Sequence, residues 1–274
     1  MTVLNDLGPD AAHGMYIEFG GSAVAGMSIP ERMIMCGNAG FAGAITQSDA
    51  ATQAWFRANV GLEVEAIGPD PDAVYVRVVR YEGGAFKPMV TYPPEVFTSK
   101  PAAYLSHVEI DQRIIGTCAG GTLKDIRVVA SILKGRQVHE RVRFVVSPVT
   151  QRVYAQAANE GLVGILSDAG VRVVSSSCDV CVGVVAPLAE GEVGLSQQTM
   201  NVPGRSGSMR ADIYLASAET IAVSALTGRI TDPGRAIRRF TIGCLAAQRS
   251  GSPRSQKPID RHIPADQNLF GDRG

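Results

Sequence analysis

The sequence has no excess of charge of either sign, few aromatic residues and no long apolar run. Lys and Arg number 26, as do Asp and Glu, and aromatics are 6% of 274 residues. This balance provides no field for attracting nucleic acid or an anionic membrane, and little surface for stacking bases. The sequence contains no stretch of 18 uncharged apolar residues, so it predicts no membrane-spanning segment. Residues 1–12 carry acidic side chains and no basic one, unlike a secretory signal, so we expect a cytoplasmic protein with reduced thiols.

The length and composition predict two folded units and a tail. Hydrophobic residues make up 45% of the chain, which excludes a disordered protein. Lys100-Pro101 is a plausible boundary between a smaller α/β domain at 1–100 and a second α/β domain at 101–248. Residues 249–274 contain three prolines, frequent charges and no apolar periodicity, which predicts an extended tail.

Strand and helix patterns alternate along the chain. Ser28 and Glu31 form a capping-box pattern before a predicted helix that ends near residue 42. Further helices are expected at 48–59, 122–133, 150–160 and 217–227, and strands at 74–80, 107–116, 143–147 and 171–175. This order predicts an α/β fold with mainly parallel sheets, flanking helices and two α/β lobes. Ligands of such sheets bind beyond the carboxyl ends of the strands.

Three of the five cysteines lie at predicted strand ends. Cys118 follows one strand and precedes Gly120-Gly121, and Cys178 and Cys181 form a Cys-x-x-Cys motif after another. Parallel neighbouring strands would bring the three sulfurs to one edge of the sheet. Glycines permit close approach of the backbone to a bulky group. Nearby hydroxyls and amides would serve an electron-rich iron–sulfur cluster.

Several interpretations of these cysteines remain open. A thioredoxin-type redox pair is one, although the tryptophan and proline of that motif are missing nearby. A zinc site is another, and it would require a fourth ligand such as Cys36, Cys244 or a histidine. Buried core cysteines are the third. We favour a cluster held by three cysteines with one iron left open.

Several segments resemble the aconitase and 3-isopropylmalate dehydratase large-subunit family. The order and spacing of the segments agree over about residues 3 to 235, corresponding to the second and third domains of that family. They are Ile17-Glu18-Phe19-Gly20-Gly21, Met27-Ser28 with Glu31-Arg32-Met33, Gly116-Thr117-Cys118-Ala119-Gly120-Gly121, Ser177-Cys178-Asp179-Val180-Cys181-Val182-Gly183 and Asn201-Val202-Pro203-Gly204-Arg205.

The resemblance implies a 4Fe–4S hydro-lyase that acts on a hydroxy carboxylic acid. It implies that Cys118, Cys178 and Cys181 hold the cluster and that Arg205 binds a substrate carboxylate. We expect the backbone amides near Gly120 and Gly121 to help anchor that anion. The resemblance also implies missing parts, namely a chain that supplies the first domain of the family and a small swivel-domain subunit.

Some positions depart from the family pattern. Gly37 and Phe41 stand where the family has an asparagine and a glutamate, and Thr199-Met200 replaces an Asn-Arg pair. Ala119-Gly120 replaces the Thr-Asn that follows the first cysteine. Because most of these changes remove polar groups, the alternative hypothesis is a catalytically degenerate subunit with a structural or regulatory role.

Overall fold

The computed structural model describes residues 1–8, 12–39 and 43–234. The described residues form two sheets, one with two strands and one with seven. The expected tail at 249–274 lies outside the described residues, as do Phe41 and Cys244. No helix in the described part has the length and apolar character needed to cross a bilayer.

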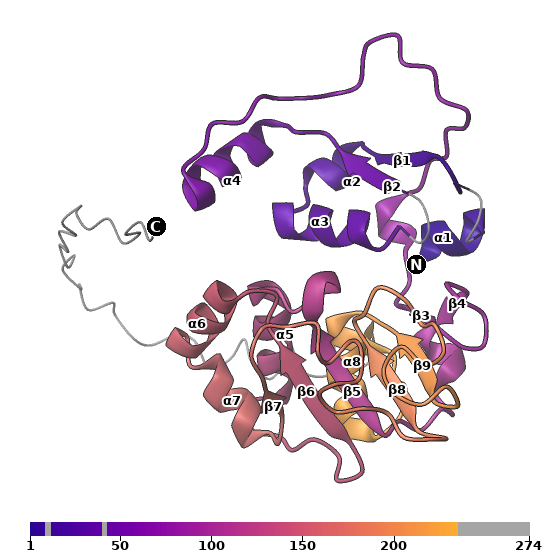
Figure 1. Ribbon diagram of the computed structural model, residues 1–274, viewed down its shortest axis with the longest axis vertical. Helices are drawn as coiled ribbons and strands as arrows, with labels where there is room; N and C mark the ends of the chain where they lie inside the picture. Colours follow the sequence, from indigo (N-terminus) through magenta and orange to yellow (C-terminus); the bar gives the residue numbers. More distant parts are fainter. Residues whose placement is uncertain (9–11, 40–42, 235–274) are drawn as a thin grey trace, which may run out of the picture.

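The N-terminal unit is small. It contains α1 (Thr2–Leu7), β1 (Tyr16–Phe19), α2 (Ser22–Ala25), α3 (Ile29–Gly37), β2 (Gly43–Thr46) and α4 (Ala50–Val60). Strands β1 and β2 pair in parallel, with Tyr16 opposite Gly43. A long connection without helix or strand follows α4 up to the short helix η1 (Gly83–Ala85), and it forms the projecting loop at the top of Figure 1.

The larger unit is built on the seven-stranded sheet. Its strands are β3 (Met89–Thr91), β4 (Ser99–Pro101), β5 (Gln112–Gly116), β6 (Arg143–Ser147), β7 (Arg172–Val173), β8 (Val193–Ser196) and β9 (Asp212–Leu215). The order is β4-β3-β9-β8-β5-β6-β7. The run from β9 to β7 is parallel, and β3 and β4 add an antiparallel hairpin at one edge. The expected α/β class is thus confirmed.

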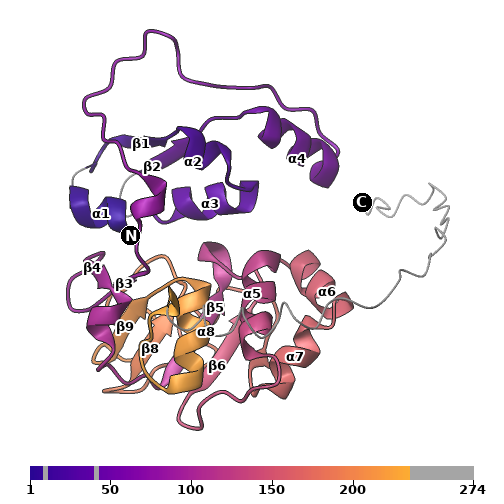
Figure 2. The same cartoon turned by 180° about the vertical axis from the view of Figure 1, so that it is seen from behind.

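Helices cover one face of this sheet and a loop covers part of the other. Helices α5 (Leu123–Leu133) and α8 (Ala218–Thr227) lie in front of the strands in Figure 2, beside α6 (Gln151–Asn159) and α7 (Leu162–Asp168). The main core lies between these helices and the strands. On the opposite face Val180, within the Cys-x-x-Cys motif, packs against Ile114 of β5 and Val145 of β6. The motif is therefore part of the packing of the sheet.

Local capping explains where the helices begin. The Glu31 carboxylate accepts hydrogen bonds from the Ser28 amide and hydroxyl, as the capping-box pattern predicts. Thr122 caps α5 and Ser217 caps α8, which ends at Gly228 in the left-handed conformation.

Two expectations are wrong in detail. Residues 74–80 form no strand, although their β-branched sequence predicts one, because no neighbouring strand pairs with them. Strands β3 and β4 belong to the large sheet, so that sheet begins at Met89 and the expected boundary near residue 100 falls inside it. The short helix η2 (Ala102–Leu105) follows β4 directly.

Candidate metal-cluster site

The topology of the large sheet creates a switch point between β5 and β8. From β5 the chain moves outward through β6 to β7, and it then returns to β8 on the other side of β5. In parallel sheets the loops that leave such a pair of strands diverge and open a crevice at their carboxyl ends. Cys118 lies in η3 (Thr117–Ala119), directly after β5, and therefore at this crevice.

Close packing of backbone fixes the loop that carries Cys118. Gly116 has a φ of 134°, and a Cβ there would lie 1.8 Å from the Ser147 carbonyl oxygen. Gly121 has a φ of 65°, and its Cβ would lie 2.6 Å from the Gly116 Cα. Thr117 also has a φ of 65°, which is unfavourable for a β-branched residue. The two glycines are required here because no side chain fits, and the strain at Thr117 is located beside the predicted ligand.

Hydrogen bonds connect the Cys-x-x-Cys segment to the end of β6. The Ser147 hydroxyl lies 3.1 Å from the Ser175 carbonyl oxygen and 3.3 Å from that of Ser177. The Cys181 amide donates to the Cys178 carbonyl oxygen at 2.9 Å, which closes a tight turn between the two cysteines. The segment that carries both cysteines is therefore attached to the carboxyl end of β6, at the same end of the sheet as the end of β5.

A second set of contacts fixes Cys181 against the loop after β8. The Ser206 hydroxyl donates to the Cys181 carbonyl oxygen at 3.2 Å, and the Gln198 side-chain amide donates to the Ser206 hydroxyl at 2.8 Å. Cys181 is 1% exposed, whereas Cys118 and Cys178 are exposed. The site therefore combines one buried sulfur with two that solvent reaches.

Three side chains of the site, Thr117, Cys178 and Arg205, influence the Cys181 thiol. Burial raises the pKa of its thiol, and the nearby Thr117 hydroxyl and Arg205 guanidinium oppose that rise. Cys178 is close enough to act in the same direction as burial. These interactions show that residues from the β5 loop, the motif and the β8 loop surround one sulfur atom.

Three buried polar atoms near the cysteines have no well-formed hydrogen bond in the described chain, beyond the interaction of the Thr117 and Arg205 side chains with the Cys181 thiol. They are Thr117 Oγ1, Ser176 Oγ and Arg205 Nε. A buried polar group without a partner costs about 1–3 kcal/mol. Each belongs to a segment that also carries or contacts a predicted ligand. Unsatisfied donors beside thiols suit an electron-rich group whose sulfurs accept hydrogen bonds. The residues present therefore fit an iron–sulfur cluster.

A site for a single metal ion is not formed. Among the described residues, no three His, Cys, Asp or Glu side chains are arranged to hold one ion. A 4Fe–4S cluster makes a different demand, because each thiolate binds its own iron and the sulfurs need not converge on one point.

The predicted anion-binding groups are only partly available. The Gly120 amide donates to the Thr117 carbonyl oxygen at 3.4 Å, and the Gly121 amide donates to the Gln197 side chain at 3.2 Å. An anion at these amides would have to displace those partners. Arg205, which is predicted to bind a substrate carboxylate, is half-buried. It donates a hydrogen bond to the Thr199 hydroxyl at 3.3 Å.

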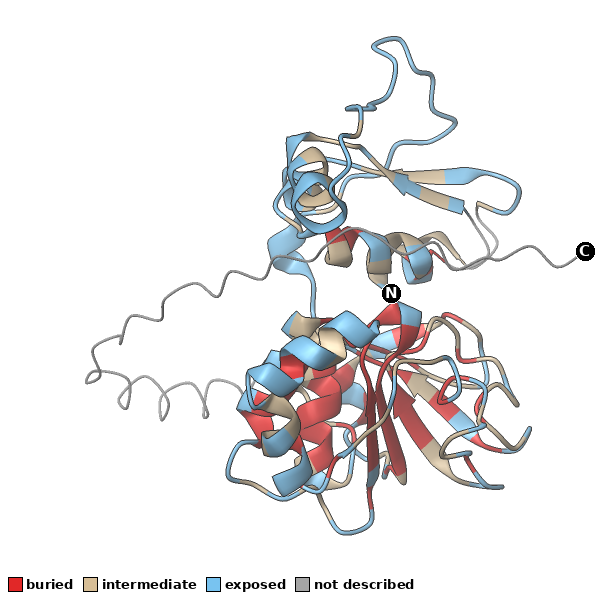
Figure 3. Cartoon of the chain, turned by 60° about the vertical axis from the view of Figure 1, so that its left-hand side comes forward, coloured by how far each residue is buried: buried red, intermediate tan, exposed pale blue. Residues whose placement is uncertain are grey.

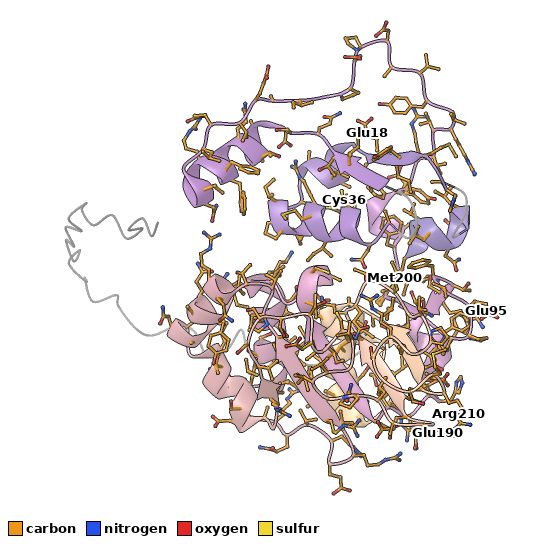
Figure 4. All side chains as sticks on the ribbon, viewed as in Figure 1. Glu18, Cys36, Glu95, Glu190, Met200 and Arg210 are labelled. Atoms are coloured by element: carbon orange, nitrogen blue, oxygen red, sulfur yellow. The ribbon has the colours of Figure 1, made fainter. Side chains whose placement is uncertain are left out.

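A cleft of about 1450 Å³ lies between the two units, and Ala119, the neighbour of Cys118 in the chain, lines it. On the side of the large sheet its lining includes Ala119, residues 197–199 and residues 215–217, at or beyond the carboxyl ends of β5, β8 and β9, together with residues of the β3 region. Helix α3 packs against η3 and its residues line the opposite wall. Figure 4 shows Met200 at the edge of the larger unit that faces α3, and Cys36 on α3 itself. The three predicted ligands do not line this cleft.

Sequence reasoning overlooked the polar residues that organise the site. Ser147, Gln197, Gln198 and Ser206 all lie at or beyond strand ends, and three of them are buried. Asn201 was included only in a family motif, yet its buried side chain holds the 95–97 loop by accepting from the Phe97 amide at 3.1 Å. The sequence signal that could identify these residues is a polar side chain at or directly after the end of a buried apolar strand.

Comparison with known proteins agrees with this fold. The aconitase family (aconitate hydratase) model matches residues 95–228, which hold β5 to α8 and all three cysteines. The expected relationship to the aconitase family is therefore confirmed.

The chain is also similar to curated large subunits. It is 37% identical to the 3-isopropylmalate dehydratase large subunit of Heliobacterium modesticaldum over 234 residues, covering 84% of this chain and 56% of the relative. It is 38% identical to a probable 3-isopropylmalate dehydratase large subunit of Methanothermobacter thermautotrophicus, covering 85% and 57%. The chain thus spans somewhat more than half the length of these relatives.

Proposed function

We propose that the chain is a component of an iron–sulfur hydro-lyase that acts on a hydroxy carboxylic acid, as 3-isopropylmalate dehydratase does. The observation that carries this proposal is the cysteine site, in which three segments meet at the switch point of the sheet with unpartnered donors around a buried thiol. The identity to large subunits over most of the chain supports the same reaction class.

Each residue of the site has a proposed role. Cys118, Cys178 and Cys181 hold a 4Fe–4S cluster, which when bound supplies an open iron as a Lewis acid for a hydroxyl group. Thr117 and Arg205 present donors to the Cys181 side of that cluster. Arg205 also offers a planar fork that suits a substrate carboxylate. The amides of the 120–121 loop lie nearby as secondary anion ligands.

The complete enzyme requires further polypeptide. The chain spans 56% of the length of the Heliobacterium relative, and we propose that a further chain provides the part that corresponds to the rest of that large subunit. The name "large subunit" of the relatives supports an additional small subunit. We propose that the substrate binds where these chains close over the cleft between the two units.

Anaerobic reconstitution with iron and sulfide tests the cluster. The wild type should bind about four irons per chain and show the sulfur-to-iron charge-transfer absorbance and an EPR signal. Cys178→Ser should lose the cluster, whereas Cys36→Ser, on α3 and outside the predicted ligand set, should retain it. A wild-type chain that binds no iron, or equal loss in both variants, would refute the proposal.

The second candidate function is a degenerate subunit that keeps the fold without catalysis. The exchange of an Asn-Arg pair for Thr199 and Met200 favours it, because Thr199 lines the cleft and accepts a hydrogen bond from Arg205. An activity assay of the purified complex with several hydroxy acids separates the two. Turnover that falls on Arg205→Lys supports the enzyme, and a cluster-loaded complex without turnover supports the degenerate subunit.

A further inference from the structure

The N-terminal unit does not cover its own apolar side chains. Of the described residues before Met89, only three apolar side chains are buried: Leu4, Ile29 and Ala39. Figure 3 shows this unit almost entirely exposed or intermediate, above a larger unit with a continuous buried core. Most of the exposed large hydrophobic side chains of the described chain lie in this unit, including Tyr16, Ile45, Leu62, Ile67, Val74, Val76 and Val78. Such a concentration of exposed apolar surface marks an interface.

Residues 74–80 provide the most exposed part of that surface. Val74 is 96% exposed and Val76 is 91% exposed. The segment is rich in β-branched residues, yet within the described chain its residues make no backbone hydrogen bond. Unpaired amides and carbonyls on an extended apolar segment are the template that a further β-strand requires.

The segment is held beside β1, with space between them. The Tyr75 hydroxyl donates to the Glu18 carboxylate of β1 at 2.7 Å. Residues of β1 and residues 74–83 both line the cleft described above. Glu18 is labelled on the upper unit in Figure 4. An added strand could therefore contact residues 74–80 and the free edge of the β1–β2 pair.

The charges of the segment define the partner. Arg77 and Arg80 line the cleft and make no ion pair within the described residues. Antiparallel pairing of two copies of the segment about Arg77 would place like charges opposite each other, which disfavours self-association. A strand that carries carboxylates satisfies both arginines.

We propose that residues 74–80, together with β1, form the docking surface for an acid-bearing β-strand of the chain that supplies the missing remainder of the large subunit. The relatives exceed this chain by more than two fifths of their length, so a polypeptide large enough to cover the surface is available. This inference rests on the proposed function for the identity of the partner and adds the surface and the mode of contact.

Site-specific photocrosslinking in the organism that produces the chain tests this proposal. Tagged full-length chains carry p-benzoylphenylalanine in place of Val78 or, as a control, of Tyr104, which is 71% exposed on the larger unit. Position 78 should crosslink to a polypeptide whose sequence, read by mass spectrometry, matches the part of the relatives that this chain lacks. Position 104 should give no crosslink to that polypeptide. Val76→Asp should reduce recovery of that partner at least tenfold, whereas Tyr104→Asp should leave it unchanged.

The outcomes separate this inference from the proposed function. Crosslinks from position 78 to a second copy of the chain, crosslinks to the partner from position 104 alone, or equal recovery with Val76→Asp would overturn the docking surface. Iron binding reports independently, because the cysteines lie in the larger unit. Val76→Asp should still reconstitute the cluster, and a chain without iron would refute the function while leaving the crosslink result intact.

Discussion

Arg113 is the second residue of β5 and fully buried, and two of its three guanidinium nitrogens have no partner in the described chain. The third, Nη2, donates to the Ser224 carbonyl oxygen of α8 at 2.5 Å. Burial lowers the pKa of the guanidinium to about 9. The charge therefore destabilises the same strand that leads to Cys118.

The cost of this charge can be worked from its pKa. A fall from about 12.5 to about 9 corresponds to roughly 5 kcal/mol at 1.36 kcal/mol per pH unit. Replacing buried ion pairs by apolar side chains of similar volume is often neutral or stabilises proteins by about 1–4 kcal/mol, and among the described residues Arg113 has no ion-pair partner to offset its burial. Because Arg113→Met also removes the hydrogen bond to Ser224, we expect a gain of about 1–3 kcal/mol at pH 7.

Urea unfolding at several pH values measures this gain. The folded-state pKa lies below the unfolded-state value, so the penalty is fully present below pH 9 and diminishes as the pH rises above 9. The advantage of Arg113→Met should therefore be constant up to about pH 9 and shrink as the pH rises above 9.

Arg143→Met is the matched control on the neighbouring strand. Arg143 pairs with Glu192 and is 47% exposed, so its loss should cost less than about 1 kcal/mol. If Arg113→Met is less stable than the wild type by more than about 1 kcal/mol, the guanidinium is satisfied and the reasoning fails.

Three further predictions concern the site and its connections. Gly121→Ala places a Cβ 2.6 Å from the Gly116 Cα, and in thermal unfolding it should destabilise the fold by at least about 3 kcal/mol. The control is Gly135→Ala, which has open space around it and should cost about 1 kcal/mol in the same assay. Lys124 hydrogen-bonds to Glu31 and lowers the pKa of that carboxyl to about 2. Lys124→Met should therefore be less stable than the wild type at pH 7, by less than about 1 kcal/mol. This difference should vanish as the pH falls from 4.5 to 2, because the carboxyl becomes protonated in both states. Thr117→Val should weaken iron retention against a chelator about tenfold or more while Thr117→Ser retains it, and equal retention would remove the hydroxyl from the site.

Local features of the fold could be predicted from the sequence. The capping residues Ser28, Thr122 and Ser217 act within one helical turn, so their pattern identifies helix starts without knowledge of the remaining structure. The sequence predicts strand β6 with its observed bounds because four of its five residues are buried and three of those four are apolar. Strands β8 and β9 were missed, since each is short and is recognised only by its pairing.

The strand expected at 74–80 shows why a local pattern is insufficient. Its β-branched residues favour an extended backbone, but a strand also needs a partner to accept its hydrogen bonds. The residues of the site likewise divide into those recognised from a local pattern and those recognised only from contacts in the folded chain. The positions of the cysteines after strands could be predicted from the apolar runs before them. Ser147 and Ser206, in contrast, make their contacts only when the loops after β6 and β8 meet around them.

The energetics of the unpartnered atoms bear on whether the chain binds a cluster or serves only as a scaffold. Thr117 Oγ1, Ser176 Oγ and Arg205 Nε each lower stability by about 1–3 kcal/mol when they remain buried without a partner. Apolar side chains of similar size would relieve that cost in a scaffold, since the backbone of these loops is held by other contacts. A bound cluster would instead accept hydrogen bonds from these donors. Loading the cluster should therefore raise the melting temperature of the wild type more than that of Thr117→Val, whereas a scaffold would show no difference between the two.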